Sequence, residues 1–275
     1  MTANADRGEL SLLSKVPTVL RARGYRLYTA GASAKNGRLV DLWLNGGAAI
    51  LGHTPPNVLR EIKNTASRGL YAPFPHFLEG RYIKALSKLF PGYSFRLYAA
   101  PPAELETLVK NGTAGPWRPF LNPQEPFAIT ENFPILIPVL PGIQGWRNSL
   151  PLGLCVLAAQ SEDQLSALPA SDILSPVLLA AAARGIYDLI AAHDRAKLPF
   201  PRIFKALKSS ENSRWHRQGI YLTPNEKIEG SEWETLFTKF LAAGFLIPPT
   251  PSQPLILPAE MSDGEDAKLS AVLIS

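Results

Sequence analysis

The stretch that decides the fold reads Gly-Tyr-Arg-Leu-Tyr at residues 24–28, Leu-Val-Asp-Leu-Trp-Leu-Asn-Gly-Gly at residues 39–47 and Gly-His-Thr-Pro-Pro at residues 52–56. Short apolar runs on either side of the Lys-Asn-Gly turn at residues 35–37 predict two strands, at residues 25–30 and 39–44. The prolines at its end predict a helix that begins with proline in its first turn. The stretch therefore predicts a strand pair followed by a helix.

Outside this stretch the apolar pattern alternates between helical and extended segments. Helical spacing covers residues 10–23, 56–67, 77–90, 174–193, 198–207, 231–243 and 262–273. Apolar runs bounded by turn residues predict strands at residues 134–140, 150–158, 219–222 and 255–257. Prolines inside the run at 134–140 place it at a sheet edge or at a bulge. The fold class predicted is α/β, in the wider α+β sense.

Two serine–glutamate pairs have the spacing of a helix-capping box. Ser231 precedes Glu234 by three residues, and Ser262 precedes Glu265 by three residues. In such a box the serine oxygen and the glutamate side chain each accept a backbone amide at the start of a helix. Both pairs are therefore predicted to begin helices.

Composition indicates a folded protein of ordinary polarity. The chain has 275 residues, of which 46% are hydrophobic and 19% charged, so it can bury a full core. Its 26 prolines, concentrated at residues 116–151 and 248–258, predict loop-rich segments there. The single cysteine, Cys155, lies in an apolar run and cannot form an internal disulfide. We interpret it as a buried structural thiol in a reducing compartment, in preference to a nucleophile.

Targeting and partner signals are few. No N-terminal apolar segment is long enough for a signal peptide, and the apolar stretch at residues 174–190 is interrupted by Arg184 and Asp188, so we expect a cytoplasmic protein with no membrane partner. The net charge is +5. Basic and aromatic residues alternate between Lys197 and Arg217, a pattern that a nucleic-acid-binding module would also show. A solvated helix face is favoured, and nucleic acid is disfavoured as a partner.

With these residues in view, the chain resembles a class III aminotransferase that uses pyridoxal phosphate (PLP), of fold type I and similar to glutamate-1-semialdehyde aminomutase. The resemblance rests on the strand pair at 24–44, the Gly-His-x-x-Pro turn at 52–56, and the C-terminal segments from residue 219 onward. It implies a small domain assembled from both chain ends. Residues 1–95 and 201–275 would supply that domain, and residues 96–200 a shortened, proline-rich remnant of the large PLP domain.

The resemblance also implies a cofactor lysine and a phosphate-binding loop, and the sequence departs from both. Lys84, Lys88 and Lys205 lie on predicted amphipathic helices, and Lys110 follows a helical segment without an acidic strand before it. The family's Ser-Gly-Thr phosphate loop is replaced by Ala-Pro-Pro at residues 100–102, followed by Glu104 and Glu106. A second phosphate contact, a threonine contributed across the family's dimer, is replaced near Asp172.

No catalytic, cofactor-binding or metal-ligating residue is therefore nominated. The four histidines lack metal-ligand spacing. We expect an aminotransferase-like protein that has lost catalysis, binds no PLP and acts as a binding or assembly module. An isologous homodimer formed near the apolar helix at 174–190, or an unidentified protein partner, is expected with it. The alternatives are a divergent PLP-dependent aminotransferase or aminomutase, in which PLP is the cofactor, and a basic nucleic-acid-binding module.

Overall fold

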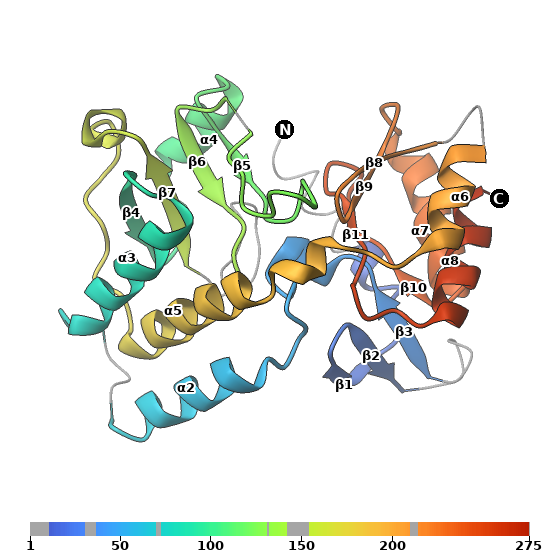
Figure 1. Cartoon of the computed structure of the whole chain (residues 1–275), viewed down its shortest axis with the longest axis horizontal. Coiled ribbons are helices and arrows are strands. Elements are labelled where there is room, and N and C mark those ends of the chain that lie inside the picture. The colour runs from blue at the N-terminus through green and yellow to red at the C-terminus, as the bar shows by residue number, and fades with distance from the viewer. Residues whose placement is uncertain are drawn as a thin grey trace. The chain divides into compact units, whose positions relative to one another are not determined.

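The computed structural model describes residues 11–30, 37–69, 73–130, 132–141, 154–209 and 214–274, which form two compact units. Unit 1 comprises the described residues within Met1–Gly46, Phe120–Glu125 and Asp194–Ser275. Unit 2 comprises those within Gly47–Pro119 and Pro126–His193. Helices and short strands alternate in both units (Figure 1), so the predicted α/β fold class is confirmed.

In unit 1 the two chain ends meet in one four-stranded sheet. Its order is β1 (Val19–Arg23), β2 (Arg26–Thr29), β3 (Arg38–Asp41) and β10 (Phe245–Leu246). The first three strands form an antiparallel meander, and β10 pairs parallel to β3, with Phe245 opposite Val40 and Leu246 opposite Asp41. The predicted pair of N-terminal strands is therefore present, and a C-terminal strand extends it.

The turn after β3 is built by Asp41, Asn45 and Gly46, and its geometry explains why these residue types stand there. The buried carboxylate of Asp41 accepts the backbone N–H groups of Trp43 and Leu44 at 2.8 and 2.9 Å. The chain then passes through Asn45 and Gly46, both with positive φ angles, 50° and 68°. Such angles cost little at glycine and less at asparagine than at most residues. The Asp and the Asn-Gly pair thus build a tight reversal.

The rest of unit 1 is a three-stranded sheet with helices. The sheet has the order β11 (Leu255–Ile256), β9 (Tyr221–Pro224) and β8 (Trp215–Gln218). The helical elements are η3 (His193–Ala196), whose first residue belongs to unit 2, and α6 (Pro201–Ser209), α7 (Gly230–Ala242) and α8 (Asp263–Ile274). Trp215 makes edge contacts with Trp233 and Phe240 at ring-centroid distances of 6.3 and 6.1 Å. These aromatic rings join β8 to α7.

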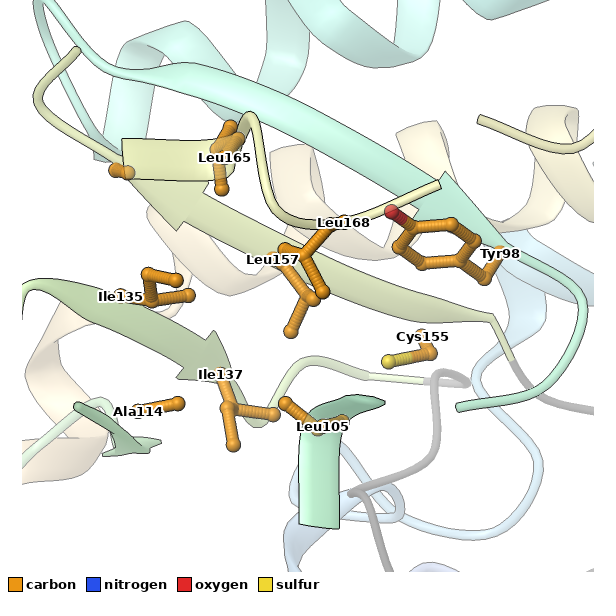
Figure 2. Packing of buried hydrophobic residues seen from close by; sticks show 10 residues of the cluster. Tyr98, Leu105, Ala114, Ile135, Ile137, Cys155, Leu157, Leu165 and Leu168 are labelled. Carbon is orange, nitrogen blue, oxygen red and sulfur yellow. The ribbon is translucent and has the colours of Figure 1, made fainter. Parts of the chain in front are cut away.

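Unit 2 is built on a second four-stranded sheet. Its order is β4 (Ser94–Tyr98), β7 (Cys155–Ala159), β6 (Ile135–Pro138) and β5 (Ala114–Trp117). Its helices are α2 (Pro56–Ala66), α3 (Phe77–Leu89), α4 (Glu104–Lys110) and α5 (Pro176–Ala191), with 3-10 turns η1 (Leu44–Gly47), at the boundary between the units, and η2 (Glu162–Leu165). Figure 2 shows side chains from the sheet, from α4 and from η2 converging on one buried apolar cluster that contains Tyr98, Leu105, Ile137, Cys155, Leu157 and Leu165.

Helix α5, which is apolar around much of its circumference, is covered within unit 2. It packs against α2 and α3. On another side Gly185 lies so close to Pro141 that a Cβ atom at this position would stand 2.9 Å from the Pro141 carbonyl oxygen. The predicted need for cover on more than one side is thus met by this chain's own segments.

The helix predicted at residues 10–23 is wrong. Only residues 11–13 are helical among the described ones, and Val19–Arg23 form strand β1. Pro17 disfavours helical geometry at the preceding residue, and the β-branched Val16, Thr18 and Val19 favour an extended chain. Hydrophobic spacing over so short a segment could not outweigh these local preferences.

The edge position predicted for residues 134–140 is also wrong, because β6 lies between β5 and β7. The prolines are tolerated by their register. The Ile135 amide donates to the carbonyl of Thr113, just before β5, and the Val139 amide donates to the carbonyl of Trp117 in β5. The registered pairing with β7 covers only Ile135 and Leu136. Pro138 therefore lies beyond the pairing with β7, and this pairing is the one in which its missing N–H group would be needed.

One of the two predicted capping boxes forms. At the start of α8, Ser262 N–H donates to Glu265 Oε2 at 2.9 Å, and Glu265 N–H faces Ser262 Oγ at 3.4 Å. The box predicted at Ser231 is wrong, because α7 begins one residue earlier with Glu229 as its N-cap. The predicted turn at 35–37 and the start of the strand at 150–158 lie partly outside the described residues.

Candidate functional site

The candidate site is the loop between β4 and α4, where the resemblance places a phosphate. Tyr98, the last residue of β4, is buried, whereas Ala99, Ala100 and Pro101 are exposed. Helix α4 has only seven residues, and its N-cap, Ala103, offers no side-chain oxygen. The first turn of α4 carries the two exposed acids, Glu104 and Glu106.

A second segment, residues 169–172, lies along β4 and closes this loop. Tyr98 Oη donates to the Pro169 carbonyl at 2.7 Å, and Leu97 N–H donates to Ser171 Oγ at 3.1 Å. Asp172 N–H donates in turn to the Leu97 carbonyl at 2.9 Å. The Ala99 amide then donates to Asp172 Oδ2 at 2.9 Å. The carboxylate of Asp172 thus takes the first backbone donor after the strand.

The donors that remain do not fit a phosphate dianion. Pro101 and Pro102 have no N–H group, and the Leu105 amide already donates to the Pro102 carbonyl at 3.1 Å. A phosphate site at a loop and helix start needs several convergent amides and a positive surrounding potential. Here one donor is taken by a carboxylate, two are absent, and two further carboxylates lie nearby.

Lysines of the described residues lie at the surface. Lys84 and Lys88 of α3, Lys110 of α4 and Lys205 of α6 are exposed, and among the described lysines only Lys239 is half-buried. Lys110 Nζ pairs with Glu106 at 2.8 Å, and Lys88 Nζ lies 5.0 Å from the centre of the Tyr187 ring. The four lysines weighed from the sequence are thus surface charges.

Cys155 is a core residue, as the sequence predicted. Its side chain lies in the cluster of Figure 2, and burial raises its pKa to about 12. Burial likewise raises the pKa of Tyr98 to about 12. Because the thiolate is the nucleophilic form, a thiol with such a pKa is inert at neutral pH.

The most heavily hydrogen-bonded carboxylate of the described residues lies in unit 1 and was missed in the sequence. Glu265 is 6% exposed and receives Arg26 Nε and Nη2 at 2.9 and 2.8 Å, together with Tyr25 Oη at 2.7 Å. Burial by itself would raise the pKa of Glu265, but the hydrogen bonds from Arg26, Ser262 and Tyr25 lower it to about 2. Burial and the neighbouring carboxylate raise the pKa of Tyr25. The capping-box spacing was a signal for Glu265, although not for its partners.

The basic residues between Lys197 and Arg217 do not form one open patch. Lys197 pairs with Asp194, and Arg214 pairs with Glu232 at 3.0 Å. Arg202 donates to the Asp263 carbonyl at 3.0 Å, and Arg217 stacks on Phe204 and donates to the Gly219 carbonyl. Lys205 and Lys208 are exposed on α6. Much of this charge is engaged within unit 1.

Within the described residues, no group of three or more histidine, cysteine, aspartate or glutamate side chains is placed to hold a metal ion. His76 is a helix cap, since its Nδ1 accepts the Leu78 amide at 3.3 Å. In the same part of the chain, no helix is both long and apolar enough to cross a bilayer.

In sequence, the chain is similar to two uncharacterized proteins. One, from Treponema pallidum, is 24% identical over 298 residues, covering 91% of this chain and 92% of that protein. The other, from Borreliella burgdorferi, is 26% identical over 264 residues, covering 94% and 90%. No family model matches the chain.

In structure, the chain is similar to aminotransferases. Ornithine delta-aminotransferase from Plasmodium falciparum aligns with a TM-score of 0.67 at 10% identity, covering 98% of this chain and 97% of that one. A transaminase with PLP bound aligns at 0.65 and 12% identity, covering 100% and 97%. An omega-transaminase from Sphaerobacter thermophilus aligns at 0.62 and 11%, covering 99% and 96%. The chain therefore has the aminotransferase fold that its sequence resemblance predicted.

Proposed function

We propose that this chain is a class III aminotransferase-like protein with a degenerate cofactor site, which binds or assembles with other molecules and does not hold PLP. One observation carries the proposal. The Ala99 amide, the first donor of the loop after β4, is bonded to the Asp172 carboxylate in a loop that also contains Pro101 and Pro102. An acid and two prolines stand where phosphate donors would be required.

Electrostatics supports this reading. A phosphate placed at the Ala99 amide would displace the Asp172 carboxylate or lie beside it. Two like charges about 4 Å apart repel by about 1 kcal/mol in water and by more near a protein surface. Glu104 and Glu106, exposed in the first turn of α4, add to the repulsion. The loop is suited to closing on its own chain and poorly suited to an anionic cofactor.

The positions of the lysines also support the proposal that this chain does not hold PLP. PLP enzymes hold their cofactor through a lysine amine placed inside a site. The described lysines are exposed or, for Lys239, half-buried, and Lys110, in the helix that follows the loop, is paired with Glu106. An amine in this setting is solvated and is not directed at a cofactor.

An assembly role is supported by exposed apolar side chains in unit 2. Phe74 and Phe77, beside the start of α3, are 56% and 70% exposed, and Ile173, next to Asp172, is 56% exposed. Large exposed apolar side chains of this kind are available for contacts with another protein. A homodimer, a cytoplasmic location and the assignment of residues 96–200 to a shortened large domain belong to the same proposal.

PLP titration with borohydride reduction tests the proposal. After free PLP is removed by desalting, we expect no visible absorbance to remain with the protein and, after reduction, no stoichiometric label on any one lysine. A PLP-dependent transaminase treated in parallel labels a single lysine. One fully labelled lysine with visible absorbance would instead establish the alternative, a divergent PLP-dependent aminotransferase or aminomutase. Peptide mapping of the reduced product would identify that lysine.

A rebuilt loop provides the matched control. The variant Pro101→Gly/Pro102→Thr/Asp172→Thr restores two amides and removes the competing carboxylate. We expect it to bind inorganic phosphate more tightly than the wild type, measured by calorimetry. Wild-type phosphate binding as tight as that of the rebuilt variant would contradict the role given to these residues.

A further inference from the structure

We propose that the edge strand β1 and the arginine face beside it bind an extended protein segment in which acidic and apolar residues alternate. The segment would add to the sheet as a neighbour of β1. The inference stands on unit 1 alone and does not depend on whether the loop after β4 holds a phosphate.

Strand register places basic side chains on one face of the sheet. Arg21 lies opposite Tyr28, and Tyr28 lies opposite Arg38. One row further along, Arg23 lies opposite Arg26. Because directly opposed residues project to the same side and side chains two residues apart share a face, all four arginines lie on this face. We call it the arginine face.

The arginine face has more positive charge than its own contacts neutralise. Glu265 pairs with Arg26 and, at 3.6 Å, with Arg38. Among the described residues Arg23 has no ion-pair partner, and Arg21 stacks over the Tyr28 ring at 4.5 Å. Arg23 and Arg26 are directly opposed like charges, an arrangement that destabilises an isolated sheet. An external anionic group would relieve this repulsion.

The strand next to this charge has an unpaired edge. Within the described residues β1 pairs only with β2 and ends the sheet, as its outer position in Figure 1 shows. Its side chains are largely exposed, with Val19 at 43% and Leu20 at 69%. A free strand edge offers backbone donors and acceptors to an extended peptide.

The alternation of side chains along β1 sets the partner's chemistry. Arg21 and Arg23 project to the arginine face, whereas the half-buried Ala22, which lies opposite the buried Leu27, projects to the other face. The register shifts between Val19 and Arg21, so the regular alternation covers Arg21 to Arg23. An added strand would place every second side chain near the arginines and the remainder on the face of Ala22. Acidic residues suit the first set, and apolar residues suit the second.

A protein segment fits this surface better than nucleic acid or a second copy. The arginine face has one aromatic ring on β1–β3, Tyr28, and Arg21 already covers it, so it lacks an open ring on which bases could stack. Nucleic acid also cannot use the backbone edge of β1. A second copy pairing antiparallel along β1 would bring Arg21 and Arg23 of both copies together, and this contact would be repulsive.

Fluorescence anisotropy on the full chain tests the proposal. The probe is a labelled, end-capped decapeptide that alternates glutamate with valine. We expect Arg21→Glu/Arg23→Glu to weaken its binding more than tenfold. The matched variant Lys205→Glu/Lys208→Glu, which reverses two exposed charges on α6, should change binding less than twofold. Thermal unfolding would verify that both variants are folded.

Two N-methylated probes distinguish strand addition from simple charge attraction. Methyl groups on alternate amides block one edge of the peptide, and methyl groups on the other amides block the opposite edge. One of the two peptides should lose binding more than tenfold, and the other should retain it. Equal binding by both, no effect of the arginine reversals, or tighter binding of a ten-nucleotide oligothymidylate or of phosphatidylserine vesicles would each overturn the proposal.

Discussion

The carboxylates of α8 in unit 1 and the carboxylate of Asp172 in unit 2 hold their donors in opposite ways. In unit 1, Glu265 and Asp266 are buried on α8, and each receives donors from segments far away in sequence. Asp266 accepts the amides of Arg202 and Ile203 at the start of α6, at 3.3 and 3.1 Å. In unit 2 the core is apolar, and Asp172 is exposed and bonded to one loop amide.

This contrast separates stability from binding. A buried carboxylate with several donors is costly to disrupt, because its loss leaves buried donors and charges without partners. An exposed carboxylate with one donor can be replaced by water. We therefore expect Glu265 to matter for folding, and Asp172 to matter for what the loop can bind.

The largest effect is expected from Glu265→Ala. The variant removes the carboxylate that accepts Arg26 Nε and Nη2, the Tyr25 hydroxyl and the Ser262 amide, and it leaves these donors without their acceptor. The free energy of unfolding should fall by about 3–5 kcal/mol, as when other buried ion pairs lose one partner. Urea denaturation measures it. The control Glu232→Ala, which breaks the exposed pair with Arg214, should cost about 0–1 kcal/mol. Equal costs would contradict the contrast.

The same carboxylate should make stability depend on pH. Its pKa is lowered from 4.5 to about 2 in the folded state, so its contribution is complete above about pH 4.5 and is lost as pH falls toward 2. At about 1.4 kcal/mol for each pH unit, this lowering corresponds to about 3 kcal/mol. The difference in unfolding free energy between wild type and Glu265→Gln should be nearly constant above about pH 5 and should shrink as pH falls from about 4.5 toward 2. A difference that stayed constant over that lower range would show that the charge of Glu265 is not what stabilises unit 1.

Much of the fold was predictable, because its elements are specified locally. The strand pair around residues 25–44 and the helices near 56–67, 77–90 and 174–193 are bounded by glycine and proline and have clear apolar spacing. The central position of β6 was not predictable, because it depends on which amides of a proline-containing strand face which neighbour. The order of the strands is set by pairing between β6 and strands that are distant in sequence, and local residue patterns do not encode this pairing.

Of the candidate site, only the missing phosphate donors were predictable from the sequence. Two prolines remove two amides wherever the loop lies, so Pro101 and Pro102 could be interpreted without a structure. The bond between Ala99 and Asp172 joins residues 73 positions apart, and the bond between Tyr25 and Glu265 joins residues 240 positions apart. Neither pairing leaves a signal in local spacing, so the carboxylate roles required the fold.

Two helical glycines of unit 2 should respond to alanine with opposite signs. At Gly185 in α5 a Cβ would stand 2.9 Å from the Pro141 carbonyl oxygen, whereas at Gly80 in α3 nothing lies within 4 Å. Gly185→Ala should cost about 1–3 kcal/mol through overpacking, and Gly80→Ala should stabilise by about 0.5–1 kcal/mol through helix propensity. Thermal unfolding measures both. A stabilising Gly185→Ala would show that α5 is loosely covered, and would revive the need for a second copy at this helix.

The smallest effect is expected from Asp172→Ala. The variant removes a single exposed acceptor, so unfolding free energy should fall by about 1 kcal/mol or less, because water can replace the carboxylate at the Ala99 amide. Hydrogen exchange at Ala99 should nevertheless accelerate, while the Leu97 amide, held by Ser171, should keep its protection. Phosphate affinity should remain low, because Pro101 and Pro102 still lack N–H groups. If Asp172→Ala instead destabilised the protein as much as Glu265→Ala, the loop after β4 would be a structural anchor, and the contrast between Glu265 and Asp172 would fail. If the variant gained phosphate binding without the proline changes, the carboxylate alone would be what excludes the anion.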